Sequence, residues 1–150
     1  MLLLETSTTG EITRLEIAAP AGLLTLHPGP DPMMLHGNVV RPSGIEHVAL
    51  PWSPGHALLA AASPLTGAVA ASWLAHRIGV GEGDRFPVVE VGDDLTIRRA
   101  TWRAARVADR RWLLLAADRG VSVTVTLDDD AALAGLEAAA GWPLEVDLQA

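Results

Sequence analysis

The 150-residue sequence contains no cysteine, no tyrosine and no lysine, and only six of its residues are aromatic. Without cysteine, the chain can form no disulfide, no thiolate nucleophile and no cysteine-ligated metal site. Without lysine, it has no Schiff-base nucleophile and no phosphate-binding lysine of the Walker A type. These absences exclude several classes of enzyme, and no cofactor is expected.

Acidic residues outnumber basic ones by 18 to 11, so the formal net charge is −7. With 49% hydrophobic and only 19% charged residues, the chain is too apolar to be intrinsically disordered. Its length predicts that residues 1–150 form a single domain. The strand and helix patterns of the sequence make this an α+β domain. The apolar start has no basic residues of the kind that begin a secretory signal, so a cytoplasmic protein is expected. The uncharged run 57–75 is mostly alanine and contains proline and serine, so no membrane association is predicted.

Short apolar runs separated by glycine and proline predict a mainly antiparallel sheet or partly closed barrel. The run 121–127 alternates apolar and polar residues and is predicted to pair with 111–117 in a hairpin. The runs 45–50 and 56–62 flank a Pro-Gly loop and predict a second hairpin. Segment 95–107 fits both helical and strand patterns, and its β-branched and aromatic residues favour a long strand. The remaining predicted strands are 2–7, 12–18, 23–27, 87–91 and 144–148.

Two helices are expected to accompany the sheet. Ser63 and Pro64 are typical of a helix start, and they predict a central Ala-rich helix over about 64–78 on which the sheet packs. The aspartates at 128–130 predict a short C-terminal helix over about 130–140. The apolar stripe expected on the central helix is Leu65, Val69, Trp73 and Ile78.

The five histidines are the only side chains that titrate near neutral pH, and none has the sequence spacing of a metal-ligand pair. No metal site is therefore expected. Four histidines lie in the stretch 27–56, which is predicted to be rich in loops and to hold any small-molecule pocket. One hypothesis is an isomerase or lyase acting on a small carboxylate, with His36 or His56 as general acid–base and Arg41 binding the carboxylate. It requires these three side chains to line one concave pocket.

Seven of the eleven arginines lie between residues 98 and 119, interleaved with Trp102 and Trp112. This composition resembles that of a single-stranded nucleic-acid surface, which would need both tryptophans exposed beside the arginines. The net negative charge argues against nucleic acid as a partner. Arginines on a strand more often meet acidic residues of a neighbouring strand or subunit.

Three segments resemble parts of three different folds. Residues 22–34 are similar to the Pro-Gly loop of the β-sandwich in the epsilon subunit of ATP synthase. Residues 50–62 are similar to a segment of the phenazine-biosynthesis-type isomerases, and residues 87–140 resemble the second half of bacterial pleckstrin-homology-like modules. Because these folds are mutually incompatible, the sequence identifies no family.

The leading hypothesis is a non-catalytic binding or assembly module that self-associates. Tryptophan and arginine are enriched at interfaces, and the sequence shows no catalytic constellation. The expected partner is a second copy of the chain or another protein, with a small-molecule ligand as the alternative. The predicted contact residues are Trp52, Arg98, Trp102 and Arg103.

Overall fold

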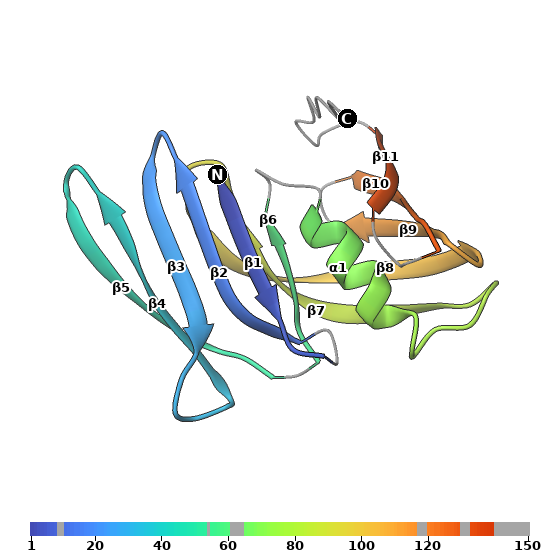
Figure 1. Cartoon of the computed structure of the whole chain (residues 1–150), viewed down its shortest axis with the longest axis horizontal. Coiled ribbons are helices and arrows are strands. Elements are labelled where there is room, and N and C mark those ends of the chain that lie inside the picture. The colour runs from blue at the N-terminus through green and yellow to red at the C-terminus, as the bar shows by residue number, and fades with distance from the viewer. Residues whose placement is uncertain (9–10, 54, 61–64, 117–119, 130–132, 140–150) are drawn as a thin grey trace.

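The computed structural model describes residues 1–8, 11–53, 55–60, 65–116, 120–129 and 133–139. Over these ranges the chain forms eleven strands in two sheets and one helix (Figure 1). The protein is therefore mostly β and broadly α+β, as the sequence predicts. Within the same ranges, no helix has the length and apolar character that a membrane crossing requires.

Sheet A is an antiparallel meander in the order β1-β2-β3-β4-β5. One tight turn depends on Gly22, because a Cβ at its φ of +139° would lie 2.1 Å from the carbonyl oxygen of Val40. The stretch 27–56 was expected to be rich in loops, but 34–51 folds into two paired strands and the turn between them. The strands are β1 Leu2–Thr6, β2 Ile12–Ala19, β3 Gly22–Pro28, β4 Met34–Arg41 and β5 Gly44–Pro51.

Sheet B has the order β11-β10-β9-β8-β7-β6. The β9–β10 hairpin and the long strand β8 confirm two of the sequence predictions. In Figure 1, the long strands of this sheet run across the view, whereas those of sheet A run steeply. The strands are β6 Ala57–Ala60, β7 Gly83–Val91, β8 Ile97–Ala108, β9 Arg111–Ala116, β10 Val121–Leu127 and β11 Leu133–Ala139.

Strands β6 and β7 are parallel, and helix α1 (Leu65–Leu74) is the crossover between them. The predicted hairpin between 45–50 and 56–62 is therefore wrong, because β5 pairs with β4 while β6 joins the other sheet. All four residues of β6 are buried. Leu58 packs toward sheet A and Leu59 packs with α1, so this strand is covered on both faces. Strands covered on both faces have continuous apolar sequences. The apolar run of β6 therefore resembles the second strand of a hairpin with 45–50, although it forms none.

Helix α1 is shorter than the predicted helix 64–78, and it is not a central helix on which the whole fold packs. It covers one face of β6 and β7, whose other face packs against sheet A. Its buried side consists of small residues and Leu74. The predicted stripe is wrong for Leu65, which is 50% exposed. A Cβ on Gly67 would lie only 3.6 Å from Val125, so the helix lies close to the sheet. The buried helix residues are Thr66, Gly67, Ala68, Ala70, Ala71 and Leu74.

Sheet B curls around α1 as a half-barrel (Figure 1). The helix packs against β6 and β10, which are four strands apart in the sheet order. In a flat sheet these strands would be about 19 Å apart. A helix with its side chains is only about 10–12 Å across, so the sheet must bend to make both contacts.

Strand β11 replaces most of the predicted C-terminal helix 130–140. It pairs antiparallel with β10, from Ser122 opposite Ala139 to Leu127 opposite Leu133. Without this pairing, β10 would present a row of unpaired backbone N–H and C=O groups at the sheet edge. The hydrogen bonds that β11 makes to these groups outweigh the helix propensity of its alanines. Residues 130–132 and the predicted strand 144–148 lie outside the described residues.

Candidate functional site

A cleft of about 180 Å³ opens where sheet A, the β5–β6 connection and α1 meet. Strand β2 contributes its first residues, and the end of β3 and the following loop contribute two prolines. The helix contributes the bulky side chains that it does not turn toward the sheet. The cleft is lined mainly by apolar groups, from Glu11, Ile12, Thr13, Pro28, Pro32, Trp52, His56, Ala57, Leu58, Val69, Ala70 and Trp73.

Trp52 and His56 stack on each other in the lining of this cleft. Their ring centroids are 5.3 Å apart, with 28° between the planes. The backbone N–H of Trp52 donates to the carbonyl oxygen of Met33 at 2.8 Å, which ties the β5–β6 connection to the start of β4. Ser53 Oγ lies 2.8 Å from Nδ1 of His56, and the backbone N–H of His56 donates to the Ser53 carbonyl oxygen at 2.9 Å. These contacts with Met33 and Ser53 fix the positions of both rings without a ligand.

The surroundings of His56 lower the pKa of its imidazole and so favour the neutral form of the ring. Burial lowers the pKa of its imidazole, the positive charge of Arg99 lowers it further, and a hydrogen bond with the Ser53 backbone acts in the opposite direction. Its Nε2 atom is buried, with no hydrogen-bond partner in the described part of the chain. The mainly apolar lining around this ring favours an uncharged ligand in the cleft.

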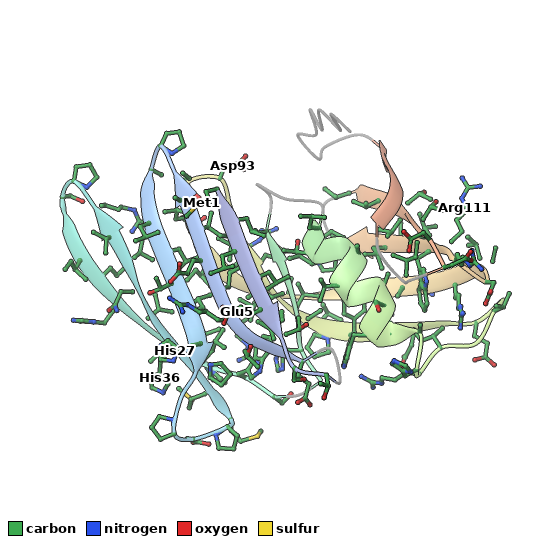
Figure 2. The ribbon with its side chains drawn as sticks, viewed as in Figure 1. Met1, Glu5, His27, His36, Asp93 and Arg111 are labelled. Carbon is green, nitrogen blue, oxygen red and sulfur yellow. The ribbon has the colours of Figure 1, made fainter. Side chains whose placement is uncertain are left out.

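The three residues of the predicted enzyme site do not come together. His56 lines the cleft, whereas Arg41 lines a second groove between β5 and the start of β8. His36 lies on β4 opposite His27 and lines neither depression. Figure 2 shows His27 and His36 near the lower end of sheet A. The arrangement therefore places neither His36 nor His56 beside Arg41 for one common substrate. Among the described residues, no three His, Asp or Glu side chains gather as a metal site.

The tryptophans of the arginine-rich segment belong to the core. Trp102 is 1% exposed and Trp112 is fully buried, so neither ring is available to stack on a base. The condition that the nucleic-acid hypothesis requires is not met. Trp102 donates its indole N–H to Glu90, and the same carboxylate forms an ion pair with Arg98.

The described arginines of this segment lie on β8, in the β8–β9 turn and at the start of β9. Arg98 is half exposed, and Arg103 is exposed on β8 opposite Arg85 on β7. Figure 2 shows Asp93 near sheet A and Arg111 at the far end of sheet B, so the segment between them runs almost the length of that sheet. Of the predicted contact residues, Trp52 thus lines the cleft, Arg98 lines the second groove, and Trp102 and Arg103 line neither.

The sequence predicts Val69 and Trp73 on the buried stripe of the helix; both are half-buried and line the cleft, and Trp73 also packs against the core around α1. The helix has a side of small residues, which faces sheet B, and a bulkier side, which is left for the cleft. The difference in side-chain size between these two sides is a signal that the sequence carries. Which part of the protein the bulky side faces depends on the placement of the two sheets, which the sequence alone does not give.

The fold and the cleft together define a protein of two sheets, one curled as a half-barrel, with a short crossover helix and an apolar depression beside it. No family model and no curated protein matches the sequence. Among solved structures, the chain is similar to the crystal structure of a DUF1089 family protein from Pseudomonas aeruginosa. The TM-score is 0.57 at 10% sequence identity, and the match covers 91% of this chain and 88% of the other. At this identity the likeness concerns the fold alone.

Proposed function

We propose that this protein is a binding module for a small, uncharged and largely apolar molecule held in the cleft beside Trp52 and His56. The observation that supports it best is the apolar lining, with a stacked aromatic pair already held in position. Small-molecule sites are usually preformed concavities of this kind, with few polar groups among apolar ones. A preformed wall also reduces the entropy lost when a ligand binds.

The size of the cleft limits the part of a ligand that it can enclose. Its volume of about 180 Å³ is close to that of the roughly 150 Å³ engineered cavity that takes up benzene. A ring system or a short branched alkyl group therefore fits, while a larger ligand would extend past Glu11 and Thr13, which are exposed.

Filling the cleft tests this proposal. Val69 is half-buried in the lining, so Val69→Trp should occupy the space without disturbing the sheet-facing side of α1. Titration with the neutral fluorophore N-phenyl-1-naphthylamine should give saturable fluorescence enhancement with the unmodified protein. In Val69→Trp the affinity should fall about tenfold or more, because a loss of ~60 Å² of apolar contact already costs that much.

The matched control is Val107→Trp, which adds the same side chain at a residue that is 52% exposed and outside the cleft. It should bind the fluorophore like the unmodified protein. Equal affinity in all three proteins, or no saturable binding by the unmodified one, would refute the proposed site.

A second candidate function, self-association, is supported by an exposed apolar row on the outer face of sheet A. Leu23, Val40 and Ile45 are register partners across β3, β4 and β5. Their exposed fractions are 38%, 40% and 65%. Contiguous exposed apolar groups of this kind are typical of contacts between copies of a chain. We propose that a second copy covers this row.

Changing Ile45, the most exposed member of the row, tests the second candidate. Light scattering after size-exclusion chromatography should give twice the chain mass for the unmodified protein and the single-chain mass for Ile45→Glu. The cause is that a buried, unpaired carboxylate opposes association. Val107→Glu serves as the control and should remain dimeric. Single-chain mass in the unmodified protein at high concentration would contradict self-association.

A further inference from the structure

The groove between β5 and the start of β8 has a volume of about 390 Å³ and lies at the open edge of sheet A. Arg41 on β4 and Arg99 on β8 line it from opposite sheets. The guanidinium of Arg41 is held in place, since Nη1 donates to Glu46 Oε2 at 2.9 Å and Nη2 donates to the Asp94 carbonyl oxygen at 3.2 Å. A fixed guanidinium loses little conformational entropy when it binds a ligand.

The charge of this groove is opposite to that of the whole chain. Three guanidinium groups, those of Arg41, Arg98 and Arg99, line it together with one carboxylate, that of Glu46. Glu46 is paired with Arg41, and Arg98 is paired with Glu90. The neighbouring carboxylate of Asp94 accepts hydrogen bonds from the hydroxyl and backbone N–H of Thr96, at 2.6 and 3.0 Å.

Arg99 is the exception among the cations of the groove. It is exposed on β8 and forms no ion pair with any carboxylate in the described part of the chain. The positive charge of Arg99 also contributes to lowering the pKa of His56. On the β5 side, Nδ1 of His47 lies 2.6 Å from Oδ1 of Asn38, which fixes that ring at the groove.

We propose that this groove binds an oxyanion, the carboxylate or phosphate group of a small molecule, with Arg99 as its main ligand and Arg41 as the second. Guanidinium groups recognise both kinds of oxyanion by paired, charge-assisted hydrogen bonds. Excess positive charge in a concave site also concentrates anions around a chain that otherwise repels them. The groove shares no lining residue with the apolar cleft.

Nuclear magnetic resonance of the arginine Nε–H groups tests the site directly. At low ionic strength, inorganic phosphate and citrate are titrated separately into the unmodified protein. The signals of Arg99 and Arg41 should shift and saturate, and the anion that binds more tightly shows whether carboxylate or phosphate chemistry fits the groove. Arg99→Gln should weaken binding about tenfold or more, as expected when a hydrogen bond to a charged group is lost.

Two further variants separate a built site from general charge attraction. Arg103→Gln removes the same charge from the same strand outside the groove and should leave the affinity nearly unchanged. Glu46→Gln should tighten binding several-fold, because it removes the negative charge that repels an anion in the groove, while the amide oxygen can still accept a hydrogen bond from Arg41. Shifts that fail to saturate, or equal weakening by Arg99→Gln and Arg103→Gln, would overturn the proposal. Fluorophore binding in the cleft is measured on the same variants, so failure of one site does not imply failure of the other.

Discussion

Replacing Glu90 by alanine is expected to lower the free energy of unfolding by about 3 kcal/mol, the usual cost of removing one partner of a buried charged group. Glu90 lies on β7 and is 7% exposed. One carboxylate oxygen accepts the indole N–H of Trp102, and the other accepts from the guanidinium of Arg98. Replacement by alanine removes the acceptor of the Trp102 indole N–H, and because Trp102 is 1% exposed, water cannot readily replace it.

The size of the loss should depend on what replaces the carboxylate. Glu90→Gln keeps an oxygen that can accept from Trp102 but loses the charge that attracts Arg98, so it should cost roughly half as much. Arg98→Ala should cost about 1 kcal/mol or less, because the side chain of Arg98 is 50% exposed and its attraction is screened by solvent. Urea unfolding followed by circular dichroism measures all three variants.

A double-mutant cycle with Trp102→Phe isolates the hydrogen bond to the indole, since phenylalanine keeps an aromatic ring without the N–H group. The cost of Glu90→Ala should be clearly smaller in the phenylalanine background. If Glu90→Ala costs no more than Arg98→Ala, the carboxylate does not act as a buried acceptor.

The parts of the fold that could be predicted from the sequence are those fixed by local pattern. The alternation of Val121, Val123 and Val125 places alternate residues on one face, and β10 forms as expected. The predicted hairpin of 45–50 with 56–62 does not form, and the four apolar residues of β6 carry no alternation that would indicate their partner. The partner of β6 is chosen by the crossover through α1, which is a property of the tertiary structure. The alanines near the C-terminus were likewise assigned a helix that the open edge of β10 overrides.

The candidate site could be predicted only in part, for the same reason. The sequence predicts Trp52 as a contact residue and His56 as a base, without relating the two. Their stacking follows from the tight connection between Trp52 and His56, where Ser53 contacts the His56 ring. That Val69 and Trp73 complete the cleft follows from the placement of α1 beside sheet A. Glu90 was overlooked, although a lone carboxylate within the valine-rich segment 88–91 indicates a buried partner.

Arg106→Ala is expected to lower the free energy of unfolding by about 2 kcal/mol, since several weak contacts of one guanidinium are lost together. The side chain of Arg106 is 17% exposed. Its Nη1 donates to the carbonyl oxygens of Ala75 at 3.5 Å and Ile78 at 3.3 Å, just after α1 ends. Carbonyls at a helix end have no partner within the helix, so these bonds hold the end of α1 against sheet B.

The same guanidinium also holds the β8–β9 turn and covers a core tryptophan. Nε and Nη2 donate to the Asp109 carbonyl oxygen at 3.0 and 2.8 Å, and Nη2 donates to the Asp109 carboxylate at 2.9 Å. The carbon Cζ lies 5.4 Å from the centre of the Trp112 ring. Lysine keeps the charge but cannot make this set of directed bonds, so Arg106→Lys should recover only part of the lost stability.

Hydrogen exchange distinguishes this bridging role from a general loss of stability. In Arg106→Ala, the backbone amides of Ala75, Arg77 and Ile78, which are hydrogen-bonded to the last turn of α1, should exchange faster than those of sheet A. Arg103→Ala, an exposed arginine on the same strand, should change stability by no more than about 0.5 kcal/mol. Because α1 also presents Val69 and Trp73 to the cleft, Arg106→Ala should weaken binding of N-phenyl-1-naphthylamine as well. Faster exchange spread evenly over both sheets would mean that Arg106 stabilises the fold as a whole, without specifically holding the helix beside its cleft.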